Sequence, residues 1–234
     1  MNAITNNLPV VKMGIVGVSR DCFPASLTKQ RLERLAAELR RDKGFAFHAS
    51  PVTVENENDA EKALADLAKN GANALCVYLG NFGPETPSTI LAQRFPGPVM
   101  AMAAAEESAA SLANDRGDAL CGLLSFAYNA RLRRLSVHIP ASPVGDAKQT
   151  ANSIRHFAAV ARVVVGVRNL KVFGFGPRPQ DFITCHAPLQ PFYDLTRDKV
   201  SPHALPFDYH GAGTHLRRAV TAVHCLADVV DDAS

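Results

Sequence analysis

The chain lacks the patterns that mark membrane and secreted proteins. None of its 234 residues belongs to an apolar run of about 18 residues, the length that a membrane-spanning helix needs. The N-terminus lacks a basic segment followed by a long apolar one, so no signal peptide is expected. The five cysteines form no CxxC pair and are odd in number, which favours reduced thiols in a cytoplasmic protein.

Charge is also scarce. Only 20% of the residues are charged, and the formal net charge is +3, so we expect no nucleic-acid partner. The basic group Arg131, Arg133 and Arg134 is interpreted as the solvated end of a helix.

Several catalytic and cofactor motifs are missing as well. The first predicted strand is not followed by GxGxxG, and no P-loop occurs. The chain has no HExxH motif, and the spacing of His210 and His215 fits no common zinc pattern. We therefore expect no metal site and no cofactor in this chain alone.

What the chain does contain is an alternation of apolar strand-like segments and amphipathic helix-like segments. The predicted strands are 10–18, 45–49, 74–79, 99–103 and 135–139, and the predicted helices are 26–43, 59–70, 86–94 and 118–132. This order predicts a parallel, doubly wound (Rossmann-like) α/β sheet with helices on both faces.

The alternation is interrupted at residues 140–145, where two prolines, a serine and a glycine indicate a linker. Beyond it, a helix over 146–165, a strand over 170–175 and a helix over 181–195 would begin a second α/β domain. We thus expect an N-terminal α/β domain over 1–140, the start of a second domain over 146–195, and a divergent tail over 196–234.

Two strand-to-helix corners have the same design. Residues 77–85 and 172–182 each run from an apolar strand through spaced glycines to a proline suited to a helix start. Such corners hold ligands in open α/β sheets, although they could also be tight turns that only connect elements. Four polar side chains would lie at the rim of a cleft: Glu85, Arg178, Gln180 and Asp181.

Other polar groups follow the predicted strands. Arg20 and Asp21 come after the first strand, where they could bind hydroxyl or phosphate groups, or could instead pair with each other and cap the helix. Glu106 and Glu107 follow the fourth strand, but adjacent helical residues do not share a face. We interpret these two glutamates as part of a solvated face, with the alternative that one of them reaches the cleft.

Seven stretches together resemble the L-fucose isomerase/L-arabinose isomerase superfamily, nearest the fucose isomerase-like proteins. They are 14–24, 78–85, 90–95, 97–100, 103–107, 117–122 and 175–182. The resemblance implies an isomerase-type N-terminal domain followed by the start of a central domain. It also implies a cytoplasmic hexamer that uses a divalent metal, commonly Mn²⁺, to isomerise aldoses and ketoses. Arg20 would reach a neighbouring subunit's active site.

The resemblance ends after residue 195, before the region that carries the family's metal ligands. We therefore expect a truncated sugar isomerase that is inactive alone, with a tail read in a shifted frame. The alternatives are a sugar or sugar-phosphate binding module, or an assembly partner of a full-length isomerase. No catalytic residue is assigned. The candidate substrate-binding residues are Arg20, Asn81, Phe82, Glu85, Arg178, Gln180 and Asp181.

Overall fold

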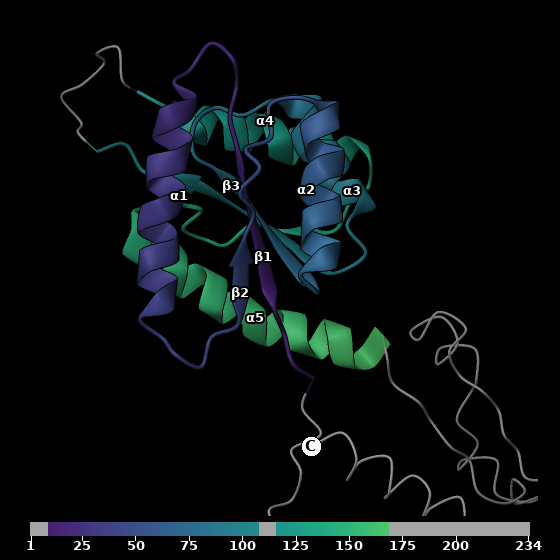
Figure 1. The fold of residues 1–234 in the computed structure, drawn as a ribbon. Helices are drawn as coiled ribbons and strands as arrows, with labels where there is room; N and C mark the ends of the chain where they lie inside the picture. Colours follow the sequence, from purple (N-terminus) through teal and green to yellow (C-terminus); the bar gives the residue numbers. More distant parts are fainter. Residues whose placement is uncertain (1–8, 108–115, 169–234) are drawn as a thin grey trace, which may run out of the picture. The chain divides into compact units, whose positions relative to one another are not determined.

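The computed structural model describes residues 9–107 and 116–168, and Val10–Val165 form one compact unit. The strands are β1 Met13–Val18, β2 Phe47–Ala49, β3 Ala74–Leu79, β4 Val99–Ala104, β5 Val137–His138 and β6 Val144–Gly145. The helices are α1 Ala25–Arg40, α2 Glu57–Lys69, α3 Glu85–Arg94, α4 Ala119–Leu132 and α5 Ala147–Arg168. Strands and helices alternate from β1 to β5 as the sequence predicts, and Figure 1 shows them as one layered α/β unit.

The strands form one sheet in the order β2-β1-β3-β4-β5, and β6 also pairs with β4. Every strand pair in the described part is parallel. The order reverses between β1 and β3, because the chain moves outward to β2 first and then returns past β1 to β3. This is a flavodoxin-like doubly wound topology, so the predicted fold class is confirmed.

Helices cover both faces of the sheet. A side chain at Gly14 would strike Leu67 of α2, whereas one at Gly17 would contact Thr28 of α1. Since these two positions of β1 point to opposite faces, α1 and α2 lie on opposite sides. The helices α2, α3 and α4 contact one another in sequence, while α5 joins α1 through a hydrogen bond from Arg155 to the Glu38 carbonyl oxygen. Figure 1 shows α1 and α2 on either side of β1.

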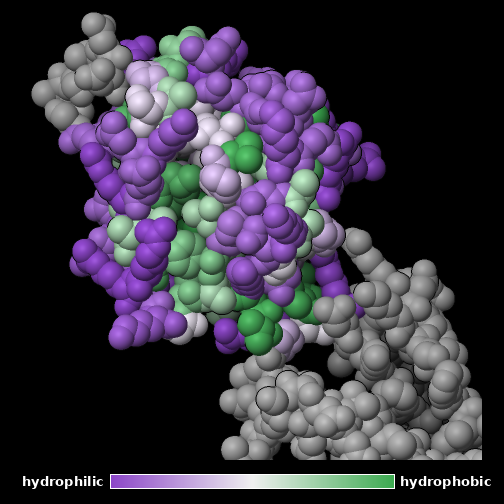
Figure 2. Space-filling view, in the orientation of Figure 1, coloured by the Kyte–Doolittle hydropathy of each residue, from purple (hydrophilic) through white to green (hydrophobic). Residues whose placement is uncertain are grey.

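The three long central strands are apolar throughout, because both of their faces are covered. All six residues of β1, of β3 and of β4 are buried. By contrast, α1 and α2 are hydrophilic on their outer sides, and Figure 2 shows an apolar strip between them where Figure 1 places β1 and β2. No helix of the described residues combines the length and the apolar character needed to cross a membrane.

Residues 140–145, where we expected a linker, contribute a strand to the sheet. Val144 and Gly145 lie beside Ala103 and Ala104 of β4, and the carbonyl oxygen of Pro143 accepts the Ala103 amide. A proline is compatible with this pairing because it supplies a carbonyl group and no donor is required of it.

The next helix packs on the same core. Ala151, Ile154 and Phe157 of α5 are buried in the hydrophobic cluster of the sheet, and Phe157 stacks on His138 with ring centroids 5.2 Å apart. Within the described residues, α5 is thus packed on the N-terminal sheet, although we expected it to open a second domain. The predicted segments 170–175, 181–195 and the tail lie outside the described residues.

Helix α4 packs very closely on the loop after β3 at Gly122. A Cβ atom there would lie 1.7 Å from the Phe82 carbonyl oxygen and 2.5 Å from the Phe82 carbonyl carbon. Only a residue without a side chain lets α4 approach the loop this closely. Gly122 therefore sets the position of that loop.

We expect Gly122→Ala to lower the free energy of unfolding by about 1–3 kcal/mol, because the clash is with backbone atoms that cannot rotate away. Gly44→Ala is the matched control, since its Cβ would meet only Asp42 Oδ1 at 3.5 Å, and it should change stability by less than about 0.5 kcal/mol. Urea unfolding of the two variants measures both values. Equal stabilities would contradict the packing described here.

Candidate functional site

The carboxyl ends of β1 and β3 lie side by side at the point where the strand order reverses. In open α/β sheets this is where the loops diverge to opposite faces and leave a crevice for a ligand. Here the two loops are residues 19–24 after β1 and 80–84 after β3. The loops contain three of the predicted site residues, Arg20, Asn81 and Phe82. The fourth, Glu85, is the first residue of α3 and directly follows the second loop.

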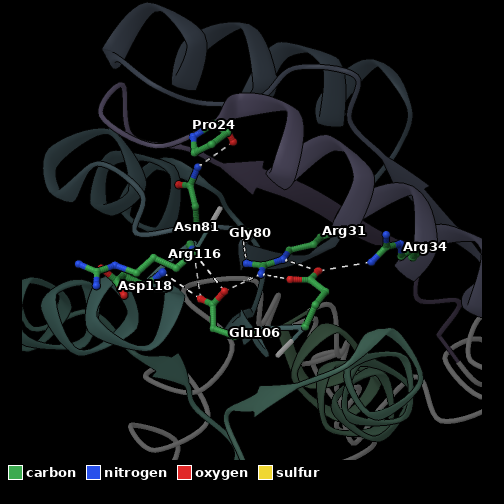
Figure 3. Close-up of polar contacts among 10 residues, drawn as sticks. Pro24, Arg31, Arg34, Gly80, Asn81, Glu106, Arg116 and Asp118 are labelled. Carbon is green, nitrogen blue, oxygen red and sulfur yellow. Dashed lines mark hydrogen bonds and ion pairs between the residues drawn. The ribbon is translucent and has the colours of Figure 1, made fainter. Parts of the chain in front are cut away.

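Asn81 joins the two loops. Its side-chain oxygen accepts the backbone amides of Arg20 at 3.0 Å and of Gly83 at 3.1 Å. Its amide nitrogen donates to Ser19 Oγ at 2.9 Å and to the Pro24 carbonyl oxygen at 3.5 Å. Asn81 is fully buried, and all these contacts are internal. Its amide therefore positions the loops, and Figure 3 shows it directed at Pro24.

Arg20, whose backbone Asn81 holds, is exposed. Its guanidinium carbon lies 5.1 Å from the centroid of the Phe82 ring, and Phe82 in turn stacks on Phe23 at 6.0 Å with a 7° tilt. This is a cation–π arrangement on a pair of parallel rings. No ion pair joins Arg20 to Asp21 among the described residues, so of the two alternatives the local Arg–Asp cap is not formed. The guanidinium is exposed and contacts the Phe82 ring.

A cleft of about 510 Å³ lies beside Arg20, within the usual range for small-molecule sites. Its walls come from the loop after β1 and from the N-terminal ends of α2 and α3. The lining residues include Arg20, Asp21, Glu55, Glu57, Glu85 and Thr86. One cation and several carboxylates together suit a ligand rich in hydroxyl groups, which both donate and accept hydrogen bonds.

Glu85 has a second set of contacts that the sequence did not indicate. Its carboxylate accepts hydrogen bonds from Ser125 Oγ and, at 3.3 Å, from Asn129 Nδ2. Both donors belong to α4, so Glu85 ties the start of α3 to α4. It also lies in the first turn of α3, where a negative charge is favourable. Its place in the cleft wall is therefore determined by neighbouring helices.

A second polar group, which we did not predict, surrounds Arg31 of α1. Its side chain is 3% exposed. Nη1 donates to the Gly80 carbonyl oxygen at 2.7 Å, Nε to Glu107 Oε1 at 3.0 Å, and Nη2 to Glu106 Oε2 at 2.8 Å and Glu107 Oε2 at 2.5 Å. Figure 3 shows the guanidinium between Gly80 and the glutamates. Glu106 and Glu107 are exposed, as a solvated face requires, but the buried guanidinium also binds both carboxylates, which the sequence did not indicate.

Glu106 extends this network to the start of α4. Its carboxylate accepts the amides of Gly117 at 3.1 Å and Asp118 at 2.9 Å. Asp118 has the left-handed backbone conformation, with φ of 50°, and Arg116 pairs with its carboxylate at 3.1 Å. The Glu106 side chain, which follows β4, thereby fixes the two residues that precede α4.

The ionisation of the network follows from these contacts. Hydrogen bonds from Arg31 hold the pKa of Glu107 below its ordinary value, against the opposing effect of burial. Burial alone would lower the pKa of Arg31, but its hydrogen bonds to Glu107 and Glu106 outweigh that effect and raise it. Both shifts favour the charged forms, so Arg31 and Glu107 form an ion pair at neutral pH.

A further cleft, of about 400 Å³, adjoins the network on the side of α1 and α5. Arg34, Glu107 and the first residues of α5 line it, together with Tyr78 from β3. Burial raises the pKa of the Tyr78 hydroxyl, so the phenol is neutral at physiological pH. This cleft contains none of the predicted site residues.

The described residues do not fit the divalent metal that the resemblance implies. No group of three or more His, Cys, Asp or Glu side chains in this part of the chain is placed to hold an ion. None of these residues is therefore assigned a role in metal binding. Of the seven predicted substrate-binding residues, the structure brings Arg20, Asn81, Phe82 and Glu85 to one edge of the sheet, and Arg178, Gln180 and Asp181 lie outside the described residues.

Comparison with known proteins agrees with the resemblance seen in the sequence. A family model described as "Fucose/sulfoquinovose isomerase, N-terminal domain" matches residues 14–168, more than half of the chain. No curated protein matches.

One similar solved structure is described as "Crystal structure of a galactofuranose binding protein", at 11% identity and a TM-score of 0.30. The match covers 70% of this chain and 66% of that one, so the chain spans slightly less than two thirds of that protein's length. At this TM-score the likeness supports no conclusion about the chain.

Removing the buried guanidinium should destabilise the fold. We expect Arg31→Met to lower the free energy of unfolding by about 3 kcal/mol, because Gly80 and two carboxylates lose their partner. Arg34→Met is the matched control: that side chain is 59% exposed and makes one contact to Glu107 at 3.3 Å, so its removal should cost less than about 1 kcal/mol. Urea titration compares the two, and similar losses would contradict a structural role specific to Arg31.

The same network predicts a dependence of stability on pH. Since the pKa of Glu107 is lower in the folded than in the unfolded chain, its stabilising contribution is complete above the unfolded pKa of about 4.3. It is lost as the pH falls through the lower folded-state value. Between about pH 5 and pH 3, wild type should lose more stability than Glu107→Gln, which has no charge to lose. Parallel pH curves for the two proteins would refute this.

Proposed function

The chain belongs to the fucose/sulfoquinovose isomerase family, whose N-terminal domain residues 14–168 match, and on that premise we propose that this domain holds a sugar for aldose–ketose isomerisation. The site is the cleft at the carboxyl ends of β1 and β3. The observation that carries the proposal is Arg20, an exposed cation placed over Phe82 on a loop that buried Asn81 holds in place.

Three properties of the cleft support a sugar ligand. The Arg20 guanidinium can donate several hydrogen bonds in a fixed plane to sugar hydroxyl groups, and the carboxylates of Asp21 and Glu57 can accept hydrogen bonds from such groups. Phe82, stacked on Phe23, lies under the Arg20 guanidinium and supports it from outside the lining of the cleft. Rigid support also reduces the entropy lost when a ligand binds.

In this proposal the described domain binds and orients the sugar, and does not itself move hydrogen between carbons. Isomerisation requires a base or a Lewis acid at the reacting carbons, and the carboxylates of Glu106 and Glu107 are already engaged by the Arg31 guanidinium. The reacting groups would come from outside the described residues or from another subunit. The chain would then be inactive alone and complete a site when assembled with a full-length homologue, with Mn²⁺ bound elsewhere.

A sugar panel tests the binding role directly. We expect L-fucose or a related aldose to raise the unfolding temperature of the full chain without added Mn²⁺, because binding to the folded state stabilises it. Arg20→Ala should raise the dissociation constant about tenfold or more, the effect of losing a hydrogen bond from a charged group.

Arg40→Ala serves as the charge-matched control. Arg40 is exposed in the last turn of α1, at the opposite end of that helix from the cleft, and its removal should leave sugar binding unchanged. Stabilisation that requires Mn²⁺ would contradict a metal-independent site in this domain. If no sugar shifts the transition but the chain co-purifies with a full-length homologue, the assembly role is supported and the binding role is not.

A further inference from the structure

Tyr78 presents a hydroxyl group without a partner to the cleft of about 400 Å³ beside α1 and α5, which we call the α1–α5 cleft. The residue is 2% exposed. Its hydroxyl forms no hydrogen bond with any other described residue. Buried polar groups are normally hydrogen-bonded, so this one lacks the partner that its position requires. The cleft is the place from which a ligand could supply it.

The direction of the Tyr78 side chain follows from the sheet register. Tyr78 of β3 lies beside Gly17 of β1, and residues in register on parallel strands point to the same face. A side chain at Gly17 would contact Thr28 of α1, so Tyr78 also points to the α1 face. After β4 the cleft is lined by the small residues Ala104 and Ala105, which leave room above the phenol.

Helix α5 begins at the same cleft, which its first two residues, Ala147 and Lys148, help to line. The first amides of a helix have no carbonyl partner within it. The Gln149 amide donates to Asp146 Oδ1 at 2.8 Å, and the Asp146 amide donates to Gln149 Oε1 at 3.0 Å. No described side chain caps the amides of Ala147 and Lys148. These two donors therefore remain available at the positive end of a 22-residue helix.

Two cationic side chains at the cleft also keep unused donors. Lys148 is exposed and forms no ion pair with another described residue. Arg34 is 59% exposed and uses one nitrogen, Nη1, which lies 3.3 Å from Glu107 Oε1. Burial raises the pKa of the Tyr78 hydroxyl, and Arg34 is close enough to oppose that effect. The cations and the phenol thus belong to one site.

The carboxylates that line the cleft are already engaged within the chain. They pair as follows: Glu38 with Arg41, Glu106 with Arg31, Glu107 with Arg31 and Arg34, and Asp146 with the Gln149 amide. The charge of Asp146 is offset by that of Lys148. Unused donors therefore outnumber unused acceptors in the cleft. This balance favours a ligand whose oxygen atoms accept hydrogen bonds and carry negative charge.

We propose that the α1–α5 cleft binds the oxyanion of a small hydroxylated acid, either a carboxylate or a phosphate group. The Tyr78 hydroxyl, the two free amides of α5 and the Arg34 and Lys148 side chains donate to its oxygen atoms, as at other helix N-termini that bind anions. The second oxygen of the Asp146 carboxylate accepts a hydroxyl group of the same ligand. The inference does not rest on sugar binding, because the two clefts share no lining residue.

NMR titration of the full 234-residue chain tests the site with three matched probes: D-glycerate, glycerol 3-phosphate and glycerol. The backbone amide signals of Ala147 and Lys148 report on the cleft directly. We expect both acids to shift these signals to saturation with dissociation constants below about 10 mM, and glycerol to leave them unchanged. Tighter binding of D-glycerate would identify a carboxylate ligand, and tighter binding of glycerol 3-phosphate a phosphate ligand.

Tyr78→Phe removes the hydroxyl group alone. We expect the dissociation constant of the tighter acid to rise about tenfold, because a hydrogen bond to a charged oxygen is lost. Without ligand, the variant should keep or exceed the wild-type urea midpoint, because the hydroxyl has no internal partner to lose. A lower midpoint would show an internal role for the hydroxyl and would overturn the proposal.

A pair of lysine variants tests the charge. Lys148→Met, followed at the Ala147 amide, should raise the dissociation constant about threefold or more at low salt. Lys69→Met is the matched control: Lys69 is also exposed, in the last turn of α2 before the amino end of β3, and its removal should leave binding unchanged.

Three results would each overturn the oxyanion site. One is an unchanged pair of amide signals with either acid up to about 50 mM, well above the expected dissociation constant. Another is an equal response to glycerol, which carries no charge. The third is equal affinity of Tyr78→Phe and wild type for the acids, because the unpartnered hydroxyl would then not face the ligand.

Discussion

One buried guanidinium joins the carboxyl ends of the sheet. Arg31 projects from α1, binds the Gly80 carbonyl oxygen after β3 and holds both glutamates after β4. Glu106 passes the connection to Gly117 and Asp118, where α4 begins. A buried cation is costly unless it is fully hydrogen-bonded, so these loops must converge on it. The carboxyl edge of the sheet is organised around this requirement.

Asn81 and Gly122 complete that organisation on the other side of the switch point. Asn81 holds the backbone of Arg20, and Gly122 lets α4 pack against Phe82 itself. The exposed Arg20 and the half-buried Phe82 therefore rest on a buried amide and a helix contact that admits no side chain. Rigid support of this kind suits an N-terminal domain in a family of sugar isomerases, because a ligand gains most from groups that are already in place.

Most of the fold could be predicted from local pattern. The central strands are continuous apolar runs, and the amphipathic helices show their buried stripes, so α1, α2, α3 and β3 begin and end within a few residues of the predicted bounds. The pairing of Val144 and Gly145 with β4 could not be predicted, because their sequence indicates a turn and only the neighbouring strand supplies partners. The roles of Glu106 and Glu107 were missed for a similar reason: the partner of Glu106 lies 75 residues earlier in the chain.

The sequence by itself determined the order of strands and helices, the doubly wound class and the resemblance to a family, since these follow from periodicity and from motifs that are local. It also indicated which loops come to the ligand edge, because the carboxyl ends of parallel strands share one edge. Only the tertiary structure decided which polar residues there are free and which are used internally. Arg20 and Asn81 are both polar loop residues, but one is exposed and the other is fully buried. That difference arises from packing between distant segments, which no local pattern encodes.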